Sequence, residues 1–248
     1  MKRVTVIAAT GLVLAFAAAG AIAAGWWFLI REDAGLATSP PEIPEGLVDA
    51  TATASSTEGS TNGSSTDSDV LTFRINSSLS EAAYFVDEEL ASVGIPSTAK
   101  GATSEISGTF YVTADGAAFS PDAASSFTVD LRNLTSDKPM RDRSVQEALA
   151  TSAYPTATFR VTSVTGYDPS IPEGEQQNLQ LIGILDLHGV QEEVTWEVEA
   201  FRQGNVISAL ATLKISFADF NITPPTFAGL VSIDDRATLQ VQLIAELA

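Results

Sequence analysis

Apolar and polar residues alternate along several stretches of the chain after residue 69. The alternation is clearest in the ranges 127–131, 159–161, 194–200, 207–217 and 239–247. A period of two turns one face of a strand towards a core and the other towards water, which is typical of antiparallel sheets. Short turn sequences such as His188-Gly189 separate these stretches. The pattern therefore predicts an all-β domain over residues 69–248, built as an up-and-down barrel or a sandwich.

One short segment, from Ser144 to Ala150, favours a helix because it ends in good helix formers. Tyr154-Pro155 closes the stretch, since a residue before proline avoids helical angles. Arg141-Asp142 and Arg143 lie at the expected start of the helix, where an acidic residue suits the positive end of the helix dipole. The Arg-Asp pair therefore either anchors the helix, which is the commoner role, or contacts a polar head group of a ligand.

The first 33 residues follow a different pattern. Lys2-Arg3 precedes an uncharged run over residues 4–30, which exceeds the roughly 20 residues that span a bilayer core. The positive-inside rule keeps the N-terminus in the cytoplasm. The sequence thus predicts a single-pass anchor in the cell membrane over residues 1–33, with the remaining chain on the extracytoplasmic side. The alternative is a cleaved signal peptide, which would leave a secreted or periplasmic protein.

Residues 34–68 are rich in Ser, Thr, Pro, Gly and acidic residues, and no apolar period survives there. Such a segment buries too little surface to offset the entropy lost on ordering. Its acidic side chains favour an extended and solvated chain. The sequence therefore predicts a disordered linker from residue 34 to residue 68.

The charge and the cysteine content narrow the function. The 248 residues carry a formal net charge of −18. This charge repels phosphate backbones, so we predict no nucleic-acid partner. The chain contains no cysteine, which excludes disulfides, thiolate catalysis, cysteine-ligated zinc and a lipid-modified N-terminal cysteine.

The sequence offers little chemistry for catalysis. His188 is the only histidine, and it gives no convincing triad or metal site, so its place in a tight turn favours a structural role. The acidic pairs Glu88-Glu89, Glu192-Glu193 and Asp234-Asp235 lack the spacing of a calcium loop and are interpreted as solvated turns and edges. We therefore predict no catalytic residue, no metal, no cofactor and no enzymatic activity.

Three short motifs follow one another in the chain. They are Arg141-Asp142, Tyr154-Pro155-x-x-x-Phe159 and Gly183-x-Leu185-x-x-His188-Gly189-Val190. With these motifs in this order, the segment from Leu71 to the C-terminus resembles the YceI-like family. The resemblance implies a lipocalin-like antiparallel β-barrel with one short helix and a central cavity that holds a polyisoprenoid chain. The chain departs from the family pattern at Val145, where leucine is common, and at residues 150–153.

A hollow barrel would turn its alternating apolar face inward, because the other face carries the charges and amides. The predicted ligand-binding set on that face is Phe127, Val129, Leu131, Phe159, Val161, Leu181, Leu185, Trp196, Val198, Ile207, Leu213, Ile215, Val241 and Leu243. Gln240, on the opposite face, is expected to lie outside this set.

The favoured function is extracytoplasmic binding or transport of a long apolar lipid, without catalysis. The predicted partners are a polyisoprenoid or similar lipid and, through residues 1–33, the membrane. Two alternatives remain. One is a structural or adhesive envelope module with a filled core, because a filled barrel and a hollow barrel share the same alternating pattern. The other is an enzyme that acts on a small apolar substrate in the same cavity.

Overall fold

The computed structural model describes residues 35–48, 70–90, 95–113, 118–121, 123–225 and 231–248. The strands in these ranges are β1 (Val70–Ile75), β2 (Glu81–Leu90), β3 (Ile95–Thr103), β4 (Ile106–Thr113), β5 (Ser126–Asp130), β6 (Thr156–Thr165), β7 (Gln177–Leu187), β8 (Val190–Gln203), β9 (Val206–Ser216), β10 (Val231–Ile233) and β11 (Arg236–Leu247). The helical elements are α3 (Pro139–Ala148) and the short 3-10 helices η1 (Ser77–Leu79), η2 (Leu131–Asn133) and η3 (Phe217–Phe220).

Within the described residues, eight lines of strands close into an antiparallel barrel. Neighbours follow in the order β1, β4, β5, β6, β7, β8, β9 and β11, and β11 pairs back with β1. β2 lengthens the line of β1, because β11 pairs with β2 through residues 238–242 and with β1 through residues 245–247. β3 lengthens the line of β4 in the same way, since β3 pairs with β2 and β4 with β1. The predicted all-β antiparallel barrel is confirmed.

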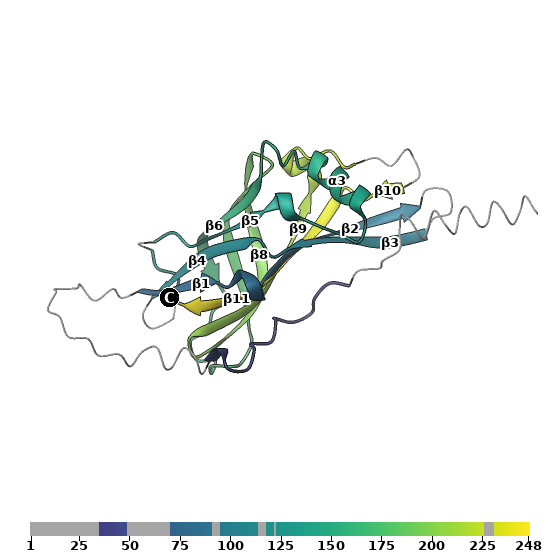
Figure 1. Ribbon diagram of the computed structural model, residues 1–248. Coiled ribbons are helices and arrows are strands. Elements are labelled where there is room, and N and C mark those ends of the chain that lie inside the picture. Colours follow the sequence, from purple (N-terminus) through teal and green to yellow (C-terminus); the bar gives the residue numbers. More distant parts are fainter. Residues whose placement is uncertain (1–34, 49–69, 91–94, 114–117, 122, 226–230) are drawn as a thin grey trace, which may run out of the picture.

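The two ends of the barrel differ (Figure 1). At one end, which we call the helix end, β2, β3 and β10 project beyond the closed ring and α3 lies nearby. Backbone hydrogen bonds between Ala102 of β3 and Thr135 attach the segment that leads into α3. At the other end, the turn end, the β8–β9 turn lies beside the last residue of β11, because the Leu247 N–H donates to the Asn205 carbonyl.

The helix α3 begins earlier than the sequence predicts, at Pro139 instead of Ser144. Proline suits the first helical position, because an N–H there would have no partner within the helix. Asp142 accepts hydrogen bonds from the backbone N–H of Ser136 at 2.7 Å and from its hydroxyl at 2.6 Å. These contacts fasten the turn before the helix, so Asp142 anchors the start of α3.

Two of the three sequence motifs meet at the helix end. The His188-Gly189 turn joins β7 to β8 with φ angles of 54° and 74°. A two-residue hairpin turn of type I′ requires such positive φ angles at both central residues. The Tyr154 ring packs edge-on against the His188 ring, with centroids 5.2 Å apart. A Cβ atom at Gly189 would lie 2.5 Å from that tyrosine ring, so only glycine fits. His188 Nδ1 also lies 3.0 Å from the carbonyl oxygen of Phe220, which gives this histidine a structural contact.

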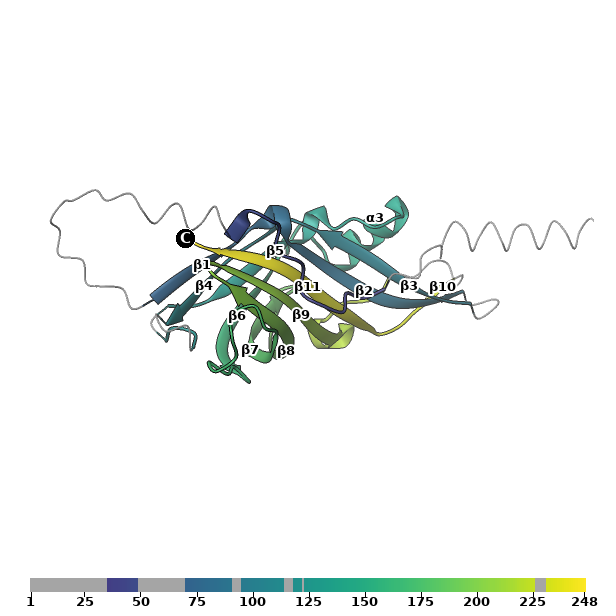
Figure 2. The same ribbon diagram turned by 90° about the horizontal axis from the view of Figure 1, so that it is seen from below.

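Residues 35–48, which we call the docked segment, lie along the outer face of β9 and β11 (Figure 2). The Gln240 side chain accepts a hydrogen bond from the Ala37 N–H at 2.9 Å and donates one to the Ala37 carbonyl at 3.1 Å. Farther along, the Ser208 hydroxyl donates to the Pro41 carbonyl, and Pro40 is buried. Val48 reaches the β8–β9 turn, where it lies 3.4 Å from the place of a Cβ atom at Gly204.

This docking corrects two predictions. Residues 35–48 are not part of a solvated linker, because backbone groups near Ala37 and Pro41 find partners on the barrel. The outer face of β9 and β11 is also not wet there, since Ser208, Gln240 and Ile244 are buried. The residues of the predicted linker from 49 to 68 lie outside the described residues.

The predicted membrane anchor over residues 1–33 also lies outside the described residues. Among the residues that the structure describes, no helix combines the length and the apolar character needed to cross a membrane.

Candidate functional site

We call the half of the barrel next to the helix end the helix half, and the other half the turn half. A cavity of about 150 Å³ lies inside the helix half. Strands β2, β3 and β5 to β11 form its wall. The helix α3 contributes Val145 and Ala148, and Leu149 directly follows the helix. Ile222, Pro224 and Pro225, which follow η3, also line the cavity. Most of these side chains are apolar, so a ligand in the cavity would exchange water for hydrocarbon contacts.

Three aromatic side chains of the cavity wall pack against one another. The Phe127 and Phe159 ring centroids lie 5.4 Å apart, and the Trp196 ring meets both edge-on at 5.8 Å and 6.1 Å. Trp196 Nε1 is buried and has no hydrogen-bond partner among the described residues. The Phe159 ring lies over Gly183, where a Cβ atom would lie 2.8 Å from that ring. This aromatic cluster therefore lies at the boundary between the cavity and the packed turn half.

The predicted ligand-binding set divides into residues that line the cavity and residues that do not. The members that line the cavity are Phe127, Val129, Leu131, Phe159, Leu185, Trp196, Ile215 and Val241. The members that do not line it are Val161, Leu181, Val198, Ile207, Leu213 and Leu243. The latter pack in or against the hydrophobic core. The alternating pattern identified the inward face but did not indicate at which level along the barrel the interior is hollow.

Sequence reasoning missed the wall that β2 contributes. Ala82, Tyr84, Val86 and Glu88 all line the cavity, at every second position of that strand. The sequence shows no alternation there, because residues 82–86 are all apolar and the inward acid Glu88 lies within the acidic run 87–89. Val145 and Ala148 of α3, and Leu149 directly after it, were also missed as lining, because nothing in the sequence indicates which face of a short helix covers a barrel.

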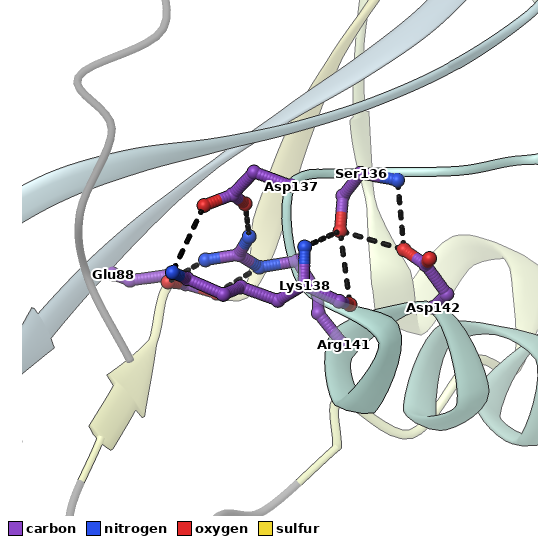
Figure 3. A network of polar contacts seen from close by, with 6 residues as sticks. All are labelled: Glu88, Ser136, Asp137, Lys138, Arg141 and Asp142. Atoms are coloured by element: carbon purple, nitrogen blue, oxygen red, sulfur yellow. Dashed lines mark hydrogen bonds and ion pairs between the residues drawn. The ribbon is translucent and has the colours of Figure 1, made fainter. Parts of the chain in front are cut away.

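A buried ion-pair cluster borders the cavity beneath α3 (Figure 3). Arg141 of α3 donates to both carboxylate oxygens of Glu88 in β2, at 3.4 Å from Nε and 3.1 Å from the terminal nitrogen. Arg141 also pairs with Asp137, whose other oxygen lies 3.4 Å from Lys138 Nζ. The side chains of Arg141 and Glu88 are only 8% and 5% exposed. The interpretation of Glu88 as a solvated edge residue is therefore wrong, since this acid faces inward and holds the helix.

Glu88 and Arg141 lie at the helix end of the cavity, which we call the mouth. Burial alone would lower the pKa of Arg141, but the hydrogen bonds and negative charges of Glu88 and Asp137 outweigh it and raise the pKa above its ordinary value. Burial raises the pKa of the cavity-lining Tyr84 well above its ordinary value of 10.0, although the positive charge of Arg141 opposes the shift. Tyr84 is therefore a neutral phenol at physiological pH. Arg141 stays charged and is held by carboxylates of the protein itself.

Comparisons with solved structures find the same fold. A polyisoprenoid-binding domain from Saccharophagus degradans, implicated in plant cell wall breakdown, matches with a TM-score of 0.54 and 18% identity over 72% of this chain and 99% of that chain. BcnA from Burkholderia cenocepacia matches with a TM-score of 0.51 and 20% identity over 68% of this chain and 98% of that chain. No curated protein sequence matches the chain.

The family comparison agrees with the motifs and the barrel. The model of the YceI-like domain matches residues 73–245, which is more than half of the chain. The match begins in β1, ends in β11 and includes the helix α3 with its Arg141-Asp142 pair. The chain therefore belongs to the YceI-like family.

Proposed function

We propose that the protein binds a long apolar lipid of the polyisoprenoid class in the cavity of its helix half, without chemical change to the lipid. One observation carries this proposal: the interior of the barrel is hollow at one end and lined almost throughout by hydrocarbon and aromatic side chains. The polyisoprenoid-binding domain of Saccharophagus degradans, which shares the fold, supports the choice of lipid class. The eight predicted residues that line the cavity are the proposed contacts.

The size of the cavity limits how the lipid enters. A cavity of about 150 Å³ is near the size of an engineered apolar cavity that admits benzene. The cavity thus accepts only a short part of a long chain in the conformation described. The rest of the lipid would have to lie in the mouth beside α3 or displace lining side chains such as Val145 and Leu149.

Binding without catalysis fits the polar groups on the cavity wall. Glu88 and Arg141 are engaged with each other. Gln240 borders the cavity, but its side chain lies on the outer face of β11 and is hydrogen-bonded to the docked segment. Tyr84 is neutral, and a phenol whose pKa is raised is a poor general base at neutral pH. The wall therefore offers shape and dryness more than reactive groups.

The proposal includes a location. The uncharged run over residues 4–30 behind Lys2-Arg3 favours a membrane anchor with the barrel on the extracytoplasmic side. A reporter enzyme that is active only outside the cytoplasm, fused after Ala248, is expected to be active. The intact mass of the purified protein separates the anchor from a cleaved signal peptide. A mass that lacks the first residues would contradict the anchor and favour a secreted or periplasmic protein.

Native mass spectrometry of the full chain, followed by organic extraction, tests the binding proposal. We expect a co-purified lipid with an isoprenoid mass series, released when the barrel unfolds. Leu185→Arg serves as the test variant, because it places an unpaired charge on the cavity wall. Arg160→Ala is the matched control, since Arg160 lies on the neighbouring strand with its side chain exposed. A folded wild-type chain that yields no lipid and takes up none from vesicles would favour the structural envelope module instead.

A further inference from the structure

The docked segment determines at which end of the barrel the chain leaves towards its N-terminus. Ala37 is hydrogen-bonded to Gln240 in the helix half, and Val48 lies at the turn end beside Gly204. The segment therefore runs along β11 from the cavity half to the turn end (Figure 2). The barrel itself begins at the turn end, because β1 pairs there with the last residues of β11.

A tether attached at Ala37 and a tether attached at the start of β1 would orient the barrel in opposite directions relative to a membrane. If the tether ended where β1 begins, the barrel would hang from its turn end, with the cavity mouth facing away from the bilayer. The docked segment carries the attachment point about 24 Å back along β11, from the level of Leu247 to that of Gln240, at about 3.4 Å per residue. From there, the mouth beyond Arg236 is only about 14 Å away.

The remaining tether is short. The chain from Ile30, the last residue of the uncharged run, to Ala37 reaches at most about 25 Å when fully extended. To bring the turn end to the membrane, this tether would have to reverse at Ala37 and use almost all of that length beside the barrel. An approach by the helix end requires no reversal.

The exposed apolar side chains agree with that direction. Of the large hydrophobic residues exposed in the described part of the chain, Leu36, Met140 and Tyr154 lie in the helix half, and Tyr167 lies at the turn end. Leu36 precedes the contact of Ala37 with Gln240, and Met140 is on α3 beside the mouth. Charge does not provide this orientation, because the net charge of −18 gives no attraction to an anionic surface.

We propose that the docked segment holds the barrel with its cavity mouth towards the membrane, so that a lipid passes directly between the bilayer and the cavity. The inference rests on the membrane anchor and the lipid site proposed above. The partner surface is the lipid bilayer in which the same chain is anchored. Residues 35–48 thereby act as a positioning strap, while the barrel itself closes through the pairing of β11 with β1.

Site-specific labels on the full chain in phosphatidylcholine vesicles test the orientation. The chain has no cysteine, so Met140→Cys and Tyr167→Cys each introduce one attachment site for a fluorophore. Both positions are exposed, at opposite ends of the barrel. With nitroxide-labelled lipid head groups in the vesicle, the label at position 140 should be quenched more than the label at position 167. Equal quenching, or stronger quenching at position 167, would overturn the orientation.

Two further variants ask whether the docked segment is the cause. The first variant, Ala37→Pro with Pro40→Asp, removes the N–H that donates to Gln240 and places a charge at a buried position. The second variant has a flexible Gly-Ser insertion after Ala34, which lengthens the tether. Each is expected to abolish the difference between the two labels. Thr38→Ala with Glu42→Ala changes only exposed positions of the same segment and should keep it. A difference that survives the insertion would show that the segment does not orient the barrel.

The same samples separate the two levels of the proposal. A chain that does not stay with the vesicles contradicts the anchor, and the orientation falls with it. A chain that stays with the vesicles and takes up lipid, but shows no difference in quenching, contradicts only the orientation. The lipid-binding proposal then stands.

Discussion

The two halves of this barrel are built from the same strands but have different interiors. In the turn half, Phe73, Leu181, Val198 and Leu243 are buried in the core without lining the cavity. In the helix half, the same strands surround a cavity of about 150 Å³. Small residues such as Ala82, Ala157 and Ala237 contribute to this space, because they line the cavity. The turn half therefore supplies stability, and the helix half supplies space.

The largest effect on stability is expected from the turn half. Phe73 is 1% exposed and also lies beneath Arg202, at 5.5 Å from its ring centroid. Phe73→Ala should lower the free energy of unfolding by about 3–5 kcal/mol, because a large aromatic side chain leaves a cavity in a packed core. Chemical denaturation measures the loss. The amount of lipid bound per folded molecule should not change, and a loss of lipid from folded protein would contradict the division into halves.

The ion-pair cluster at the mouth should rank next. Glu88→Ala removes a buried carboxylate partner of Arg141, which stays paired with Asp137. We therefore expect a loss of about 3 kcal/mol, at the low end of the range for a broken buried pair. Glu89→Ala is the control, since Glu89 is exposed on the same strand. Equal denaturation midpoints for the two variants would mean that the cluster does not hold α3 on the barrel.

A substitution on the cavity wall should cost less than one in the packed half. Ile215 is buried but faces the cavity, so Ile215→Ala removes fewer packing contacts and should cost about 2 kcal/mol. The enlarged cavity should accept more lipid or a bulkier one, which extraction and mass spectrometry of the variant measure. A cost as large as that of Phe73→Ala, with unchanged lipid, would mean that the wall is packed when the lipid is bound.

High pH should destabilise the helix half through Tyr84. Its pKa is raised on folding, mainly by burial, so the folded state favours the protonated phenol. The stabilising contribution is complete below the unfolded pKa of about 10 and is lost as the pH rises above that value towards the folded pKa. Tyr84→Phe should reduce the loss of stability between neutral pH and the range above 10. Identical pH profiles for wild type and variant would exclude Tyr84 as the cause.

The sequence predicted the barrel well because the information for it is local. Alternation along β9 and β11 and the two-residue turn at His188-Gly189 depend on neighbouring positions. Inward residues were therefore identified, including Phe127 and Trp196. The pairing of Glu88 with Arg141 was missed because it joins residues far apart in the chain.

The docked segment was missed for a related reason. Residues 35–48 have the composition of a linker, and composition gives no sign of a surface elsewhere in the chain that can satisfy their backbone. That surface is formed by Ser208 and Gln240, which the alternation placed on a wet face. The level of the cavity along the barrel was also not predictable, because it depends on how alanines from β2, β6 and β11 meet in space.

A matched pair of substitutions on β11 tests most directly whether one half of the barrel is hollow for a lipid. Ala237 and Ala245 share the inward face of this strand and are buried, but only Ala237 lines the cavity. Ala237→Leu and Ala245→Leu are compared by thermal unfolding and by lipid content. Ala237→Leu should keep or raise stability, because it fills space, and should displace lipid. Ala245→Leu should overpack the turn half at a cost of about 1–3 kcal/mol and leave the lipid bound per folded molecule unchanged. Equal destabilisation by both substitutions, with equal lipid content, would contradict the hollow half and the function proposed for it.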